Sequence, residues 1–183
     1  MGPLLVDFDV IVPCNCSALR QAARDFVDRA GAPDLVIANA GISVGTLTQE
    51  ASDLPVFERI MAVNVLGLVN TFGPFIAPMR RAGGGTLAGI ASVAGIRGLP
   101  GSGAYSASKA AAITYLEALR GELRGSGIKV ATVLPGYVET PMTAQLAFRG
   151  VMDGASAIEF RNETHIEWQR AQGAQGGLWP RAN

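Results

Sequence analysis

The chain contains 183 residues, of which 49% are hydrophobic and 16% are charged, and its 15 basic side chains balance 15 acidic ones. This length accommodates one domain with a substantial apolar core, and the low charged fraction excludes an intrinsically disordered protein. A net charge of zero also argues against a protein that binds nucleic acid electrostatically.

The few residues that could bind a metal or form a disulfide are poorly arranged for either role. Cys14 and Cys16 are one residue apart, so a bond between them would close a strained ring, and His165 is the single histidine. We therefore expect no metal site. The chain begins without the pattern of a signal peptide and contains no run of about 18 apolar residues, so we expect a cytoplasmic protein that does not interact with a membrane.

Short apolar runs alternate with longer helical patterns over most of the chain. The expected elements are a helix over residues 18–30 capped by Ser17, a strand over Leu35–Ala38, a helix from about Pro55 to Arg81, a strand over Gly85–Ser92, a helix over Ala104–Arg124 and a strand over Lys129–Leu134. This alternation with short connections predicts an α/β protein, in which a parallel sheet is covered by helices on both faces.

The sequence changes in character near its end. Residues 1–149 are expected to form a single domain, whereas residues 150–183 have weak helical patterning and a stretch rich in glycine and glutamine. For this last segment a poorly ordered tail is favoured over a functional element.

Tyr105 and Lys109 are four residues apart on an expected helix, so their side chains lie on the same face. A lysine ammonium next to a phenol favours the phenolate, which prepares a tyrosine to exchange a proton with an alcohol or carbonyl oxygen. Alone, this Y-x-x-x-K spacing is weak evidence. Ser92 strengthens it, because it ends an expected strand, where parallel α/β sheets place their ligands, and its hydroxyl can hydrogen-bond the same oxygen.

Further polar or turn-forming residues stand at the carboxyl ends of the expected strands. Asn39-Ala40-Gly41 follows the strand Leu35–Ala38, and both Pro135-Gly136 and Thr140 follow the last strand. Asn64 lies in the middle of an expected helix, which is an unusual place for a residue that prefers caps and turns.

Together these motifs resemble the classical short-chain dehydrogenases/reductases over residues from about 17 to 146. Asn39-Ala40-Gly41 resembles the family's Asn-Ala-Gly motif, and Pro135-Gly136 with Thr140 resembles the motif beside the nicotinamide. The residues similar to the family's catalytic tetrad are Asn64, Ser92, Tyr105 and Lys109, with a family-like interval of 13 (105 − 92) between serine and tyrosine.

The resemblance implies a Rossmann-like doubly wound sheet and an enzyme that transfers hydride between NAD or NADP and a carbonyl or alcohol substrate. Tyr105 would be the general acid/base, and Lys109 would assist it and bind the nicotinamide ribose. Ser92 would orient the substrate carbonyl, and Asn64 would hold a water that links Lys109 to solvent. The residues implied to contact the cofactor are Asn39, Ala40, Gly41, Tyr105, Lys109, Pro135, Gly136 and Thr140.

The sequence departs from the family at both ends. The family's T-G-x-x-x-G-x-G turn, which cradles the pyrophosphate, does not occur ahead of Asn39. We therefore expect a chain truncated at its N-terminus relative to the family, and NAD cannot be distinguished from NADP. Two hypotheses stay open: an active oxidoreductase, and a remnant that keeps the tetrad without binding a dinucleotide.

The helix expected over Ala104–Arg124 is small or apolar around much of its circumference. A helix that is apolar on more than one face is buried on more than one face, which favours a homodimer or homotetramer. Burial within a single chain is the alternative. The expected partners are otherwise limited to a small-molecule substrate whose identity the sequence does not indicate.

Overall fold

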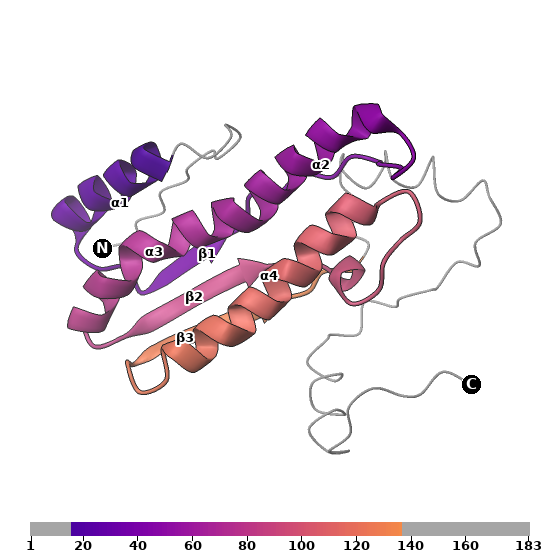
Figure 1. Ribbon diagram of the computed structural model, residues 1–183. Helices are drawn as coiled ribbons and strands as arrows, with labels where there is room; N and C mark the ends of the chain where they lie inside the picture. Colours follow the sequence, from indigo (N-terminus) through magenta and orange to yellow (C-terminus); the bar gives the residue numbers. More distant parts are fainter. Residues whose placement is uncertain (1–15, 137–183) are drawn as a thin grey trace, which may run out of the picture.

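The computed structural model describes residues 16–136 (Figure 1). Its helices and strands, in chain order, are α1 (Cys16–Ala30), β1 (Leu35–Ala38), α2 (Leu54–Met61), α3 (Gly67–Arg81), β2 (Gly85–Ile90), α4 (Gly103–Glu122) and β3 (Ile128–Val133). Three shorter helical segments complete this part of the chain: the 3-10 turns η1 (Ala51–Asp53) and η3 (Val93–Gly95) and the π-helical η2 (Ala62–Leu66).

Every element expected from the sequence is present, with ends that differ by at most two residues. Two differences affect the interpretation of single side chains. Ser17 lies inside the first turn of α1 rather than before it, and Ser92 lies in the turn that follows β2 rather than in the strand. Thr140 and the segment 150–183 lie outside the described residues.

The three strands form a parallel sheet in the order β1-β2-β3. Leu35 pairs with Thr86, and Gly85 pairs with Ile128, so the strands run in the same direction with their carboxyl ends at one edge. This edge therefore brings together the loops that begin at Asn39, Ala91 and Leu134.

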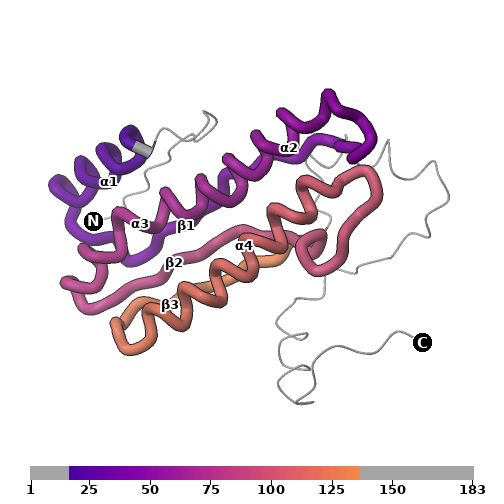
Figure 2. Tube along the Cα trace, viewed as in Figure 1, coloured from indigo at the N-terminus to yellow at the C-terminus, as the bar shows by residue number. Residues whose placement is uncertain are grey.

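Both α3 and α4 lie over the same face of this sheet, as the glycines of β2 show. A Cβ at Gly85 would collide with Met79 of α3, and a Cβ at Gly89 would lie 2.6 Å from Leu116 of α4. Because alternate residues of a strand point to the same face, the two helices cover one face. Figure 2 shows the traces of α3 and α4 over the strands, with α1 next to α3.

The core lies between these helices and the sheet. Its fully buried members include Phe72 of α3, Leu87 of β2 and Leu116 of α4. α1 joins the same core through an edge-to-face contact between Phe26 and Phe75, whose ring centroids are 6.1 Å apart. The apolar faces of α3 and α4 are thus buried against the strands, and α1 packs on α3.

On the other face of the sheet apolar side chains are exposed. Leu35 is 52% exposed, Ile37 53% and Val133 42%, although their neighbours Val36 and Ala38 are buried. The sequence predicted helices on both faces, and within residues 16–136 the helices cover one. The continuous apolar character of β1 nevertheless agrees with a strand of the kind that is buried on both faces in parallel sheets.

The helical run Ala51–Arg81 is long and apolar enough to cross a membrane by length and composition alone. The core helix of a soluble protein passes the same test, and the α3 part of this run contributes Phe72 and Met79 to the core. The segment differs from the uninterrupted apolar run sought in the sequence, because polar residues such as Asn64 and Asn70 lie within it.

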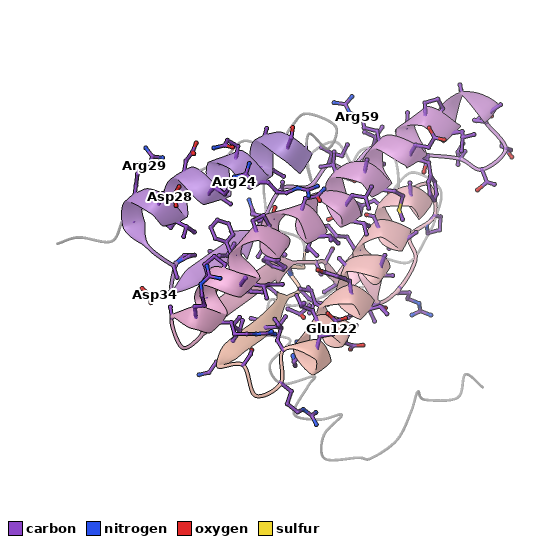
Figure 3. The ribbon with its side chains drawn as sticks, turned by 60° about the vertical axis from the view of Figure 1, so that its left-hand side comes forward. Arg24, Asp28, Arg29, Asp34, Arg59 and Glu122 are labelled. Carbon is purple, nitrogen blue, oxygen red and sulfur yellow. The ribbon has the colours of Figure 1, made fainter. Side chains whose placement is uncertain are left out.

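Charged side chains are on the outer surfaces of the helices and turns. Arg24, Asp28 and Arg29 are exposed on α1, where Figure 3 labels them. Arg59 of α2 and Glu122 of α4 are exposed as well. This distribution leaves Lys109 as the charged side chain that is buried within the described residues.

Candidate active site

The loops that follow β2 and β3 are joined to each other at the carboxyl edge of the sheet. The amide of Ala91 donates to the carbonyl of Val133 at 2.8 Å, and the amide of Val93 donates to that of Pro135 at 3.2 Å. The segment around Ser92 is therefore fixed beside Pro135 and Gly136. Two of the sequence-predicted groups are thus neighbours in space.

Asn64 lies within the π-helical segment η2 and is 2% exposed. Its Nδ2 donates to the carbonyl of Ile42 at 3.0 Å and to Oγ of Ser108 at 2.9 Å, and its Oδ1 accepts from the amide of Ile42 at 2.8 Å. Single π turns in helices are frequent at functional sites. The π turn of η2 places Asn64, a residue type that is rare inside helices, where its side chain hydrogen-bonds the loop after β1.

These three bonds bear on the role implied for Asn64. A side-chain amide offers two N–H donors and two acceptor lone pairs, so one lone pair of Oδ1 is left for another partner. The side chain is thus chiefly a connection between the β1 loop and α4. The predicted water between Asn64 and Lys109 stays a prediction.

Tyr105 and Lys109 lie one turn apart on α4, as their spacing predicted. Lys109 is 4% exposed, its Nζ donates to the carbonyl of Ile90 at 2.8 Å, and it lies 5.7 Å from the centroid of the Tyr105 ring. Burial lowers the pKa of Lys109 from 10.5 to about 8, because the charged form loses hydration. Tyr105 itself is partly exposed.

Gly41 brings the loop after β1 against this lysine. A Cβ at Gly41 would lie 3.3 Å from Nζ of Lys109 and 3.5 Å from Oδ1 of Asn64. Any side chain at this position would therefore crowd both groups. Asn39 and Ala40, the other two residues of the motif, are exposed at the end of β1.

Ser92 caps the short turn η3. Its Oγ accepts a 3.1 Å hydrogen bond from the amide of Ala94, which leaves the hydroxyl proton able to be donated to a ligand. The same turn is packed directly on α4, since a Cβ at Gly95 would lie 2.6 Å from the backbone carbon of Lys109. The turn after β2 and the lysine thus form one packed unit.

Sequence reasoning missed two groups in this site. Ser108 is fully buried and joins Asn64 to the carbonyl of Tyr105, and the backbone carbonyl of Ile90 holds the ammonium of Lys109. A serine three residues after Tyr105 lies on the same helix face, and that spacing could have indicated Ser108. Nothing in a sequence marks an individual carbonyl such as that of Ile90.

Among residues 16–136, no group of three or more histidine, cysteine, aspartate or glutamate side chains is arranged to hold a metal ion. The polar groups gathered at the carboxyl edge are instead hydroxyls, an amide and one ammonium. Such a set suits hydrogen bonding to an oxygen-rich organic ligand and the transfer of a proton.

Comparison with known proteins identifies a single family. The profile of short chain dehydrogenases matches residues 6–148. An uncharacterized oxidoreductase of Myxococcus xanthus is 43% identical over 163 residues, which are 87% of this chain and 58% of that protein. The ketoacyl reductase HetN of a Nostoc species is 37% identical over 142 residues, covering 76% of this chain and 48% of that protein.

Solved structures show the same relationship. A short chain dehydrogenase from Burkholderia cenocepacia, solved in complex with NADP, superposes with a TM-score of 0.65 at 32% identity over 72% of this chain and 54% of that one. The chain thus spans about half the length of the relatives it matches.

Proposed function

The chain belongs to the short-chain dehydrogenase family, and from this premise we propose that it is an NAD(P)-dependent oxidoreductase acting on a carbonyl or alcohol substrate. The observation that carries the proposal is the buried ammonium of Lys109 beside Tyr105, at the edge where the three strands end. Among residues 16–136 no carboxylate contacts this buried lysine, which makes its charge costly to maintain, and catalytic use is a common reason for such a cost.

The residues at this edge fit the nicotinamide and ribose part of the cofactor. The ammonium of Lys109 has three N–H donors. One of them donates to the carbonyl of Ile90, so another can donate to the ribose hydroxyls. Gly41 lets backbone approach closely where a Cβ would crowd Lys109. We propose that the residues in contact with the cofactor are Asn39, Ala40, Gly41, Tyr105, Lys109, Pro135, Gly136 and Thr140.

The protein groups would handle the proton, while the bound nicotinamide supplies or accepts the hydride. Tyr105 gives its phenolic proton to the carbonyl oxygen of the substrate, or takes the proton of an alcohol in the reverse direction. The positive charge of Lys109 stabilises the phenolate that this transfer leaves. Ser92, whose oxygen already accepts the Ala94 amide, donates its proton to the same substrate oxygen.

Titration with NADH and NADPH, followed by fluorescence, tests the cofactor. Saturation at micromolar concentrations would support the enzyme. Charge-assisted hydrogen bonds contribute about 1.5–3 kcal/mol each, so a cofactor site without two or three of them would bind the dinucleotide more weakly by orders of magnitude. Absence of binding at millimolar concentrations would therefore favour the alternative, a remnant that keeps the tetrad without the cofactor.

Substitution of the two partly buried tyrosines of α4 tests the proton transfer. Tyr105→Phe removes the proposed acid/base and should lower turnover by at least about 100-fold with the fold intact. Tyr115→Phe is the matched control, because Tyr115 packs against the core. A fully active Tyr105→Phe enzyme would refute the assignment.

We further propose a cytoplasmic homodimer or homotetramer. Ala107 of α4 is exposed, and Ala110 and Ala111 are only partly buried, so a small apolar surface is left for a second subunit. Sedimentation analysis would distinguish an oligomer from a monomer.

A further inference from the structure

The hydroxyl of Ser108 makes two hydrogen bonds inside the protein. It donates to the carbonyl of Tyr105 at 2.7 Å and accepts from Nδ2 of Asn64 at 2.9 Å. Ser108 and Asn64 are 0% and 2% exposed, so neither group can replace a lost partner with bulk water. The link therefore ties the first turns of α4 to the π-helical segment η2.

Asn64 extends this connection to the loop after β1. Its amide holds both the N–H and the carbonyl of Ile42, the residue that follows Gly41. Gly41 in turn lies next to Nζ of Lys109, since a Cβ at Gly41 would be 3.3 Å from that nitrogen. The path Ser108–Asn64–Ile42 thus fixes the stretch of backbone that faces the ammonium of Lys109.

The surroundings of Lys109 show why the position of this backbone matters. Within residues 16–136, Tyr105 is the titratable side chain next to the ammonium of Lys109, and the other groups against that ammonium are the neutral backbone of Ile90 and Gly41. The elements packed against α4 carry their charges on exposed side chains, namely Glu58, Arg59 and Lys129. Within the described part of the chain, the environment of the ammonium is therefore set by exclusion of water rather than by an opposite charge.

We infer that Ser108 is a positioning residue: by holding Asn64, its hydroxyl keeps the Gly41–Ile42 backbone against Lys109 and water away from the ammonium. The effect of this hydrogen-bonded connection on turnover rests on the proposed function. The connection itself is present in the protein without cofactor or substrate.

The composition of the chain allows a direct measurement. Lysine occurs only at Lys109 and Lys129, and Lys129 is exposed on β3, so selectively labelled lysine gives one signal for the site and one internal reference. NMR titration of these signals reports the pKa of Lys109 in the full chain without any ligand. A Lys129→Arg variant assigns the two.

Ser108→Ala should raise the pKa of Lys109 from about 8 toward 10.5, because the loosened backbone admits water. Thr114→Ala is the matched control, since Thr114 is on the same helix and its exposed hydroxyl makes a bond of the same kind to Ala110. That control should leave the pKa of Lys109 unchanged. Ser108→Cys, which keeps the size of the side chain and weakens both bonds, replaces Ser108→Ala should the latter not fold.

An unchanged pKa of Lys109 in a folded Ser108 variant would overturn the inference, even in a chain that is an active oxidoreductase. A raised pKa would support it, even in a chain that binds no cofactor. The two proposals can therefore fail separately.

Discussion

The ammonium nitrogen of Lys109 lies 2.8 Å from the carbonyl oxygen of Ile90, the last residue of β2. This bond satisfies one of its three donors in a site that is almost completely closed to solvent. Near neutral pH the folded protein keeps this buried group charged, because its pKa is lowered only to about 8. The hydration lost by the ammonium is a cost that the unfolded chain does not bear.

This cost predicts a specific dependence of stability on pH. The folded state releases the proton of Lys109 near pH 8 and the unfolded state near 10.5, so between these values the unfolded chain binds more protons. The free energy of unfolding should therefore gain a contribution as pH rises through this window, of about 3 kcal/mol in total. Lys109→Met should lack that contribution, as urea denaturation at several pH values would reveal.

Lys129→Met is the control for this prediction. Lys129 is exposed on β3, so its replacement should leave the pH dependence of the wild type in place. Parallel curves for the wild type and Lys109→Met between pH 8 and 10.5 would contradict the assignment of the cost to Lys109.

The contrast between Leu35–Ala38 and Asn64 shows how far sequence predicts this molecule. Leu35–Ala38 has the predicted bounds, because four apolar residues between turn formers specify a short strand locally. The sequence marks Asn64 as unusual in a helix, but it does not predict the π turn. That turn accompanies hydrogen bonds to Ile42 and Ser108, which are 22 and 44 residues away along the chain.

The same distinction applies to Tyr105 and Lys109 on α4. The i, i+4 spacing predicts that Tyr105 and Lys109 share one helix face, and in the structure the ammonium of Lys109 lies over the Tyr105 ring. The bond from Lys109 to Ile90 joins a helix to a strand 19 residues earlier, and it depends on how closely the two are packed. Local periodicity predicts which side chains share a face, whereas the partner of each polar atom depends on the tertiary structure.

A pair of glycines in the turn before β3 provides a matched test of how β2 and β3 are joined. Gly125 and Gly127 both have positive φ, at 78° and 80°, so alanine costs about 1–2 kcal/mol at either position. At Gly127 the new Cβ would also collide with the carbonyl of Gly83, whereas Gly125 faces open space. Gly127→Ala should therefore destabilise the protein by at least about 1 kcal/mol more than Gly125→Ala in urea denaturation. Equal losses would show that the turn before β2 moves aside freely.

The turn that carries Ser92 contains a second matched pair. A Cβ at Gly95 would lie 2.6 Å from the backbone carbon of Lys109 and 2.8 Å from the amide nitrogen of Ala110, whereas one at Gly98 would meet nothing within 4 Å. Neither glycine has a positive φ, so the two alanine variants differ in space rather than in backbone strain.

Gly95→Ala must push η3 away from α4, because helix backbone cannot rotate out of the way as a side chain can. We expect it to destabilise the protein by about 1–3 kcal/mol and, in the proposed enzyme, to reduce turnover by displacing the turn that carries Ser92 relative to α4. Gly98→Ala should retain the stability and turnover of the wild type. Urea denaturation and steady-state kinetics on both variants measure these effects, and a Gly95→Ala protein as stable as Gly98→Ala would show that the close contact between η3 and Lys109 is not required.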